Sequence, residues 1–261
     1  MGFEYIDYKE FNNTAIIKIN RPEVYNALNK SAKAEIVEAI SQANNSKEVR
    51  SIILTGEGKA FCSGQDLNDR SVSNGDAPLD LGYTLETEWI PLVKAIKNSS
   101  KIIIGTINGV CAGAGISIAF ACDLIVSRSN VKFVSGFSKL GLCPDAGISY
   151  TFTRALGYHE ALEFFLFNTP YSSEELKKKG LINVVSEDPL KNAKELSQKL
   201  NTLAPLSNKL IKENLQVALD KNFTSSLDKE TSSQRELGKT EDYQEGLNAF
   251  FEKRAPNFKG Q

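Results

Sequence analysis

The sequence predicts an α/β fold in which parallel strands are covered by helices. Two observations support this prediction. Short apolar runs typical of buried strands alternate with segments of helical periodicity through the first 150 residues. From about residue 148 onward strand signals become rare and helical patterns dominate. We therefore divide the chain into a core over residues 1–200 and a C-terminal helical region over residues 201–261.

The first elements are predicted as two strands, a helix and a third strand. Residues 4–11 and 14–20 alternate or run apolar on either side of a polar "NN" turn. Residues 31–45 place apolar side chains three and four positions apart, which predicts a helix, and residues 50–56 form a short apolar run. A polar segment with glycine, serine and proline follows at residues 68–82.

The middle of the chain repeats this alternation. A helix is predicted around residues 85–96, followed by a strand at residues 101–108. A glycine-rich turn then opens a helix at residues 116–123, and residues 123–127 and 132–134 supply further short strands. These elements complete the predicted parallel sheet.

Helical signals dominate the remainder. Ser172 and Glu175 have the spacing of a capping box, and a late strand is predicted at residues 182–186. Apolar residues three and four apart predict helices over residues 190–200 and 204–219. The apolar stripe persists to the end of the chain, so we expect this helical region to pack on another surface.

Composition excludes several classes of protein. The chain has 261 residues, of which 41% are hydrophobic and 24% charged, so it can bury a substantial core. Lysine plus arginine (31) nearly balances aspartate plus glutamate (32), which gives no support for nucleic-acid or membrane-surface binding. The start "MGFEYIDYKEF" lacks the basic and apolar run of a signal peptide. We expect a soluble cytoplasmic protein without membrane spans.

The cysteines and the histidine limit the chemistry. The four cysteines stand singly, without a C-x-x-C pair, so reduced and mostly buried thiols are expected. The only histidine, His159, is predicted on a surface helix, which leaves too few ligands for a histidine-rich metal site or a histidine triad. No metal is expected, whereas a Ser/Lys or an all-carboxylate site stays open.

Two segments share a design that suits anion binding. Residues 51–67 and 102–123 each run from a strand through a turn of small residues into a helix. Such turns leave backbone N–H groups free at a helix start, where the dipole favours negative charge. Small residues are also required for tight turns and close packing, so a purely structural role for these two segments stays open.

The stretch "GLCPDAGIS" places one carboxylate, Asp145, between a proline and a run of small residues. An aspartate just before a helix is an ordinary N-cap. A carboxylate can equally act on a substrate, and the two roles are compatible.

Four stretches together resemble the crotonase, or enoyl-CoA hydratase/isomerase, family. They are "KAFCSGQDLND", "INGVCAGAGISIAFACDLIVS", "SKLGLCPDAGIS" and "YQEGLNAFFEKRAPNF", in the family's order and spacing. The resemblance covers nearly the whole chain and implies a spiral of ββα units with a C-terminal helical trimerisation region. It also implies an acyl-CoA substrate, no separate cofactor, and homotrimers that usually pair into hexamers.

The resemblance implies roles for particular residues. Two backbone N–H groups that hold the thioester oxygen map onto Gln65 and Ala114, where the family usually has glycine at the second position. The two glutamates of the family's hydratases fall on Ser117 and Phe137, which cannot act as acid or base near neutral pH. A third position, used by isomerases, falls on Asp145.

Binding residues follow from the same resemblance. The adenine is expected along the main chain from Ser63 through Leu67, and the acyl group against residues 68–90, Phe137 and Leu142. Two residues of the closing motif, Phe250 and Lys253, are expected near the nucleotide, often across a subunit boundary. The predicted binding residues are Ser63, Gly64, Asp66, Leu67, Phe137, Leu142, Phe250 and Lys253. On composition alone, a lysine near the end of a chain is usually only solvated.

We therefore expect an acyl-CoA isomerase in which Asp145 moves a proton. The stretches "FCSGQDLNDR", "APLDLG", "FSKLGLCPDAG" and "KRAPNFKGQ" resemble the family's isomerases of ring-epoxidised phenylacetyl-CoA, which form an oxepin. A double-bond shift in an enoyl-CoA fits the same residues. Hydratase activity, hydrolase or dehalogenase chemistry with Asp145 as nucleophile, and a non-catalytic CoA-ester-binding subunit are the alternatives.

Overall fold

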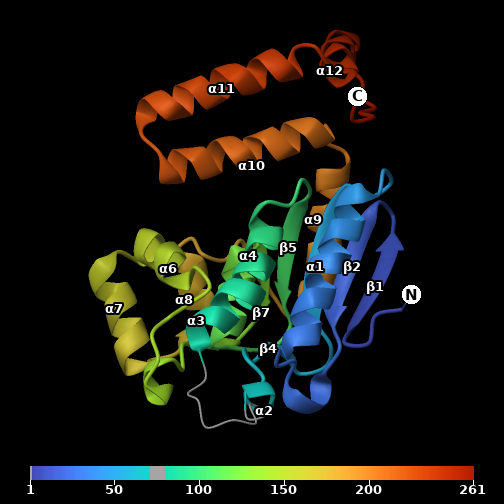
Figure 1. Ribbon diagram of the computed structural model, residues 1–261. Coiled ribbons are helices and arrows are strands. Elements are labelled where there is room, and N and C mark those ends of the chain that lie inside the picture. The colour runs from blue at the N-terminus through green and yellow to red at the C-terminus, as the bar shows by residue number, and fades with distance from the viewer. Residues whose placement is uncertain (1, 71–79) are drawn as a thin grey trace.

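The computed structural model describes residues 2–70 and 80–261, and these residues form two sheets with helices around them (Figure 1). The strands are β1 (Ile6–Phe11), β2 (Thr14–Ile19), β3 (Ser51–Gly56), β4 (Ala60–Cys62), β5 (Ile102–Ile107), β6 (Val110–Ala112), β7 (Leu124–Arg128), β8 (Lys132–Val134), β9 (Tyr171–Ser172) and β10 (Val184–Ser186). The larger sheet has the order β1–β2–β3–β5–β7–β10, and the smaller has the order β4–β6–β8–β9. In the larger sheet only β1 and β2 pair antiparallel.

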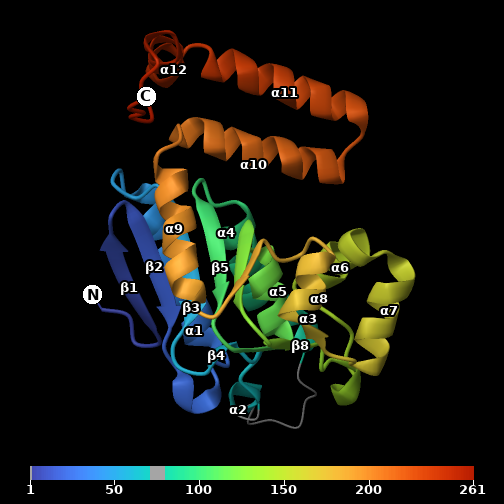
Figure 2. The ribbon, with the colours of Figure 1, turned by 180° about the vertical axis from the view of Figure 1, so that it is seen from behind.

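The described residues also form helices around the two sheets. They are α1 (Lys30–Asn45), α2 (Leu67–Arg70), α3 (Leu81–Thr84), α4 (Ile90–Lys97), α5 (Ala114–Ala121), α6 (Ile148–Leu156), α7 (Tyr158–Phe167), α8 (Ser173–Lys178), α9 (Pro189–Asn201), α10 (Pro205–Asp220), α11 (Phe223–Leu237) and α12 (Glu241–Glu252), with two 3₁₀ turns, η1 (Pro22–Val24) and η3 (Ser138–Leu140), and a π-helix, η2 (Leu85–Trp89). Figure 1 shows α1 and α4 in front of the sheet, and Figure 2 shows α9 on the opposite face.

The core repeats one unit three times. The pairs β3–β4, β5–β6 and β7–β8 each place their first strand in the larger sheet and their second in the smaller one. Helices follow each pair: α2, α3 and α4 follow the first, α5 follows the second, and η3 and α6 follow the third. This repetition is the expected spiral of ββα units, so the predicted fold class is confirmed.

The first hairpin shows how local sequence determines an element. Asn12 and Asn13 both have positive φ, 49° and 60°, as a two-residue turn between antiparallel strands requires. Asparagine tolerates this left-handed conformation better than most residues. Phe11 therefore pairs with Thr14, as the polar "NN" between two apolar runs predicts.

Apolar side chains bury both faces of the larger sheet. Every residue of β3 is buried, as expected for a parallel strand between two helical layers. On one face Ile53 and Ile104 pack with Ala193 of α9. On the other face a larger cluster includes Ile36 of α1 and Leu92 of α4. The two layers fix the larger sheet, from which β3, β5 and β7 each lead into a strand of the smaller sheet.

The C-terminal helices lie beyond one end of the larger sheet, with α10 between the sheet and α11 (Figures 1 and 2). Lys212 of α10 forms an ion pair with Asp123 at 2.9 Å, and Nε2 of Gln216 donates a 2.9 Å hydrogen bond to the Lys97 carbonyl oxygen. The expectation of an all-helical C-terminal region is confirmed. In the described ranges, none of the helices combines the length and apolar character of a membrane span.

The structure adds strands to the predicted set, and some predicted segments fall outside the described residues. The short strands β4, β6 and β9 were not predicted from the sequence. Only β8 of the smaller sheet was, so a second sheet was not expected. Part of the polar segment at residues 68–82, including the first half of "APLDLG", falls on residues 71–79 and lies outside the described residues. The same holds for part of the expected acyl-binding range, residues 68–90.

Candidate active site

A cavity of about 180 Å³ lies where three strands of the smaller sheet end. Its described lining comes from the end of β6, from the segments that follow β4, β6 and β8, and from α2, α5, η2 and η3. The lining residues are Ser63, Gln65, Leu67, Trp89, Ala112, Gly113, Ala114, Ser135, Gly136, Phe137, Leu140, Leu142 and Asp145. Loops at one end of a set of parallel strands converge, so residues distant in sequence meet here.

The cavity brings together the three residues expected to be catalytic, Asp145, Gln65 and Ala114. Four of the expected binding residues also line it, namely Ser63, Leu67, Phe137 and Leu142. Gly64 and Asp66 lie in the same loop but are not among the described lining residues. Phe250 and Lys253 lie on and just after α12, at the far end of the molecule (Figure 1), so a single chain does not bring them to this cavity.

The N–H group of Ala114 is available because it opens a helix. Ala114 is the first residue of α5, and the first N–H groups of a helix have no partner within it. The preceding Gly113 has φ 52° and provides no side-chain cap. The helix dipole adds partial positive charge at this point. This N–H can therefore donate a hydrogen bond to a negatively charged oxygen.

The N–H group of Gln65 faces away from its neighbouring segment. Leu28 and Gln65 form an isolated parallel bridge, in which the Leu28 N–H donates to the Gly64 carbonyl oxygen (2.8 Å). The Asp66 N–H donates to the Leu28 carbonyl oxygen (3.0 Å). Because successive N–H groups of an extended segment point in opposite directions, the Gln65 N–H points away from Leu28.

Two glycines allow these donor-bearing segments to approach each other. A Cβ on Gly64, which has φ 102°, would lie 3.1 Å from the Ala114 nitrogen. A Cβ on Gly115 would lie 2.1 Å from the Cys62 carbonyl oxygen, a distance that no side chain tolerates. The start of α5 and the loop after β4 are therefore in contact through their main chains.

Asp145 does not cap the following helix, so the alternative of an N-cap is wrong. Helix α6 begins at Ile148, its N-cap is Gly147, and no side chain caps it. Ala146 and Gly147 have φ 50° and 85°, and this left-handed turn separates Asp145 from the helix start. The main-chain oxygen of Asp145 accepts hydrogen bonds from the Ile148 N–H (3.2 Å) and the Ser117 hydroxyl (3.1 Å).

The two positions of the family's hydratase glutamates hold residues with other functions. Phe137 is buried and forms part of the apolar wall of the cavity. Ser117 is buried on α5, and its hydroxyl holds the main chain of Asp145. Neither residue supplies a second carboxylate. Among the described residues that line the cavity, Asp145 is the only acidic one.

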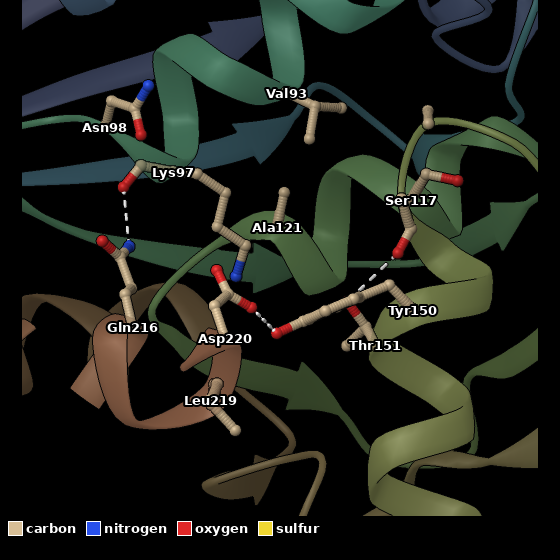
Figure 3. Close-up of a pocket in the computed structure, with 12 residues that line it drawn as sticks. Val93, Lys97, Asn98, Ser117, Ala121, Tyr150, Thr151, Gln216, Leu219 and Asp220 are labelled. Carbon is tan, nitrogen blue, oxygen red and sulfur yellow. Dashed lines mark hydrogen bonds between the residues drawn. The ribbon is translucent and has the colours of Figure 1, made fainter. Parts of the chain in front are cut away.

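A second cavity of about 320 Å³ lies between α4, α5, α6 and α10 (Figure 3). Ser117, Ala146 and Gly147 line it, so the chain around Asp145 separates it from the first cavity. Tyr150 donates a hydrogen bond to Asp220, which joins α6 to the end of α10 (Figure 3). The second cavity therefore lies at the interface between the core and the C-terminal helices.

Trp89 lies within the range 68–90 that was expected to line the acyl pocket. Ala112, Gly113, Leu140 and the pair Ser135–Gly136 also line the cavity but were not predicted from the sequence. Among the residues with described positions, no group of three or more His, Cys, Asp or Glu side chains is arranged to hold a metal.

Comparison with known proteins places this geometry in a family. The description "Enoyl-CoA hydratase/isomerase" matches residues 9–261. The chain is 38% identical over 248 residues, 94% of each protein, to the 1,2-epoxyphenylacetyl-CoA isomerase of Escherichia coli K12. It is 34% identical over 263 residues, 100% of each protein, to a probable enoyl-CoA hydratase of Rhodobacter capsulatus.

The solved structures agree. The crystal structure of an enoyl-CoA hydratase from Polaromonas sp. JS666 matches with a TM-score of 0.92 and 32% identity, over 97% of this chain and 99% of that one. The repeated ββα core and the cavity at its strand ends define an enzyme of the crotonase type. The chain belongs to the enoyl-CoA hydratase/isomerase family, the crotonase family.

Proposed function

We propose that the protein is an acyl-CoA isomerase in which Asp145 carries a proton between two carbons of the acyl group. The observation that carries this proposal is the composition of one cavity. It joins two backbone donors, Gln65 and Ala114, to a single carboxylate, Asp145. Isomerisation needs no second acid or base, because one group can take a proton and return it elsewhere.

The chemistry follows from where charge develops. Asp145 takes a proton from the carbon next to the thioester carbonyl, and the electron pair moves onto the thioester oxygen. The N–H groups of Gln65 and Ala114 stabilise this enolate, and each such donor is typically worth about 10²–10³ in rate. Protonated Asp145 then returns the proton to a carbon further along the acyl group, so substrate and product have the same atoms.

The substrate we propose is an aryl-derived or unsaturated acyl-CoA. The relative at 38% identity is a 1,2-epoxyphenylacetyl-CoA isomerase, and conversion of that thioester to oxepin-CoA is the leading candidate. The side chains of Trp89, Phe137, Leu140 and Leu142 give the cavity apolar walls, which suit a ring or a hydrocarbon chain. A shift of a double bond in an enoyl-CoA uses the same groups.

For the CoA portion we propose the main chain of residues 63–67 together with Phe250 and Lys253 from a neighbouring subunit. Phe250 is 76% exposed, and its helix lies far from the cavity of its own chain (Figure 1). A homotrimer, or a hexamer made of two trimers, would let α12 of one chain reach the site of the next. The acyl-CoA then binds without another cofactor.

Hydration of an enoyl-CoA is the second candidate, because several relatives are named as probable hydratases. In this chain Ser117 and Phe137 occupy the positions of the glutamates that activate water in the family's hydratases. A hydratase would then need Asp145 to act alone. We therefore rank isomerisation first, and hydrolysis or dehalogenation through Asp145 as nucleophile below hydration.

Product analysis tests the proposal directly. The purified protein is incubated with 1,2-epoxyphenylacetyl-CoA and with 2-enoyl- and 3-enoyl-CoA thioesters in ¹⁸O-water. We expect a product with the mass of the substrate and no ¹⁸O. A product heavier by one water indicates a hydratase, and release of free CoA indicates a hydrolase. The absence of turnover on every thioester would support a binding subunit instead.

A further inference from the structure

Lys33 is buried beside the candidate active site, and its contacts lead to Gln65. Lys33 lies in α1 with 1% of its side chain exposed, and its ammonium forms an ion pair with Glu88. It donates a hydrogen bond of 2.9 Å to Oε1 of Gln65 and lies 4.8 Å from the centre of the Trp89 ring. Removal of a charge from water is costly, so a lysine here needs such partners.

The Gln65 amide is held by three hydrogen bonds. Nε1–H of Trp89 donates to the same Oε1 at 2.9 Å, and Nε2 of Gln65 donates to the Asp66 carbonyl oxygen at 3.0 Å. Because Lys33 and Trp89 can only donate, the oxygen of the amide must face them. Side chains from α1 and η2 therefore converge on the residue whose main-chain N–H we propose as a donor to the thioester.

The stability of the fold does not by itself require a buried lysine at position 33. A buried ion pair can often be replaced by apolar residues of similar volume without loss of stability. The second buried lysine, Lys212, serves as a structural comparison. It pairs with Asp123 and donates to the Ile96 carbonyl oxygen, which fastens α10 to the core. None of these three residues is among the described lining of the cavity that contains Asp145.

We propose that Lys33 is a positioning residue that, together with Glu88 and Trp89, holds Gln65 so that its N–H stays aimed at the thioester oxygen. The inference rests on the proposed function, because it requires a thioester at this N–H. A donor stabilises an enolate only at hydrogen-bonding distance, and a misplacement of about 1 Å can cost roughly 10²-fold in rate. Lys33 touches neither substrate nor reacting atoms in this role.

Kinetics of the full-length protein test the inference. With exchange of solvent deuterium into phenylacetyl-CoA as the assay, Lys33→Met should lower kcat about 10- to 100-fold and leave KM within about threefold. Lys212→Met is the matched control: it should unfold more easily but keep kcat within about twofold. The double variant Lys33→Met/Glu88→Leu removes both charges, so we expect it to fold even if the single variant does not. Its kcat should also stay low.

Vibrational spectroscopy gives a readout that lost stability alone would not change. In the wild type, bound phenylacetyl-CoA labelled with ¹³C at the thioester carbonyl should show a carbonyl band shifted to lower frequency, because two N–H groups polarise it. The shift should shrink in both Lys33 variants and persist in Lys212→Met. A full shift and full kcat in the double variant overturn the role of Lys33. The absence of a shift in the wild type overturns the proposed oxyanion site itself, and the inference with it.

Discussion

The lack of a side chain at Gly64 lets the segments that carry the two proposed donors approach each other. A Cβ at this position would lie 3.1 Å from the Ala114 nitrogen and 3.2 Å from the Ala112 carbonyl oxygen. We expect Gly64→Ala to push the two donor segments apart and to lower kcat by about 10²-fold or more, as loss of one oxyanion donor does. Steady-state kinetics with the best thioester of the panel measures this effect.

Gly180→Ala is the control for Gly64→Ala. Gly180 has a similar left-handed conformation, φ 78°, but no heavy atom would lie within 4 Å of its added Cβ. It therefore carries the backbone strain without the contact at the site. We expect both variants to lose stability, whereas only Gly64→Ala loses turnover. Equal kcat values in the two variants would contradict the role of the close approach.

The cysteines give a prediction that is independent of turnover. Cys143 is exposed, whereas Cys62, Cys111 and Cys122 are buried. Burial raises the pKa of Cys62 and Cys122 to about 12, and that of Cys111 well above its usual range, so these thiols stay protonated at pH 8. Thiolates are the reactive form. We expect one thiol per native chain to react with Ellman's reagent at pH 8, and four after denaturation.

Residue by residue, the sequence was informative where chemistry depends on a local motif. Gln65, Ala114 and Asp145 meet in one cavity, as the family motifs imply. Lys33 could not be identified, because a lysine in a polar-looking helix gives no sign of burial. Its contacts with Gln65 and Trp89 span 32 and 56 residues of sequence and exist only once the helices pack.

Among the elements, the start of α8 tests the link between sequence and local structure. The predicted capping box is present: the Ser172 hydroxyl accepts from the Glu175 N–H at 3.2 Å, and the Glu175 carboxylate accepts from the Ser172 N–H at 2.7 Å. We expect Ser172→Ala to lower the free energy of unfolding by about 0.5–2 kcal/mol, measured by urea denaturation.

Ser232→Ala serves as the control for the cap. Ser232 lies exposed inside α11, where its hydroxyl donates only to the Lys229 carbonyl oxygen of its own helix. Alanine has the higher helix propensity, so this variant should be neutral or slightly more stable. If Ser172→Ala were as stable as Ser232→Ala, the capping box would contribute nothing to the fold.

The sequence pattern predicted the long strands and the short strands β8 and β10, but not β4, β6 and β9. The strands β3 and β5, of six residues each, stand out as apolar runs. The strands β4 and β6 have three residues each and adjoin glycine-bearing turns of small residues, so the sequence shows them as parts of those turns. Asp145 was open to interpretation as a cap because nothing in "DAGIS" shows that Ala146 adopts positive φ. That turn depends on the packing around it.

At the scale of the whole molecule, the C-terminal helices carry apolar side chains that one chain leaves exposed. They include Ile211, Leu215 and Leu219 of α10, Leu227 of α11 and Phe250 of α12. Monomeric proteins rarely expose such a number of large apolar side chains together. We expect sedimentation velocity to give a mass of three or six chains.

Substitution at these helices should link assembly to activity. Leu215→Lys places a charge on the exposed apolar side of α10 and should shift the sedimenting species toward the monomer. Activity should fall with it, because Phe250 and Lys253 would no longer reach a neighbouring site. A fully active monomer would contradict the shared site. The sequence suggests this arrangement only through family resemblance, since helical periodicity does not reveal which chain a helix contacts.

The central proposal, that Asp145 moves a proton next to the thioester, is tested most directly by solvent deuterium exchange. Wild-type protein and Asp145→Asn are incubated with phenylacetyl-CoA in deuterated buffer, and recovered thioester is analysed by mass spectrometry. We expect the wild type to introduce deuterium beside the carbonyl. Asp145→Asn should do so roughly 10²- to 10⁴-fold more slowly, with thioester binding within a few-fold. Glu163→Gln, an exposed substitution on α7, should exchange like the wild type. Exchange by Asp145→Asn at the wild-type rate would contradict the proposal.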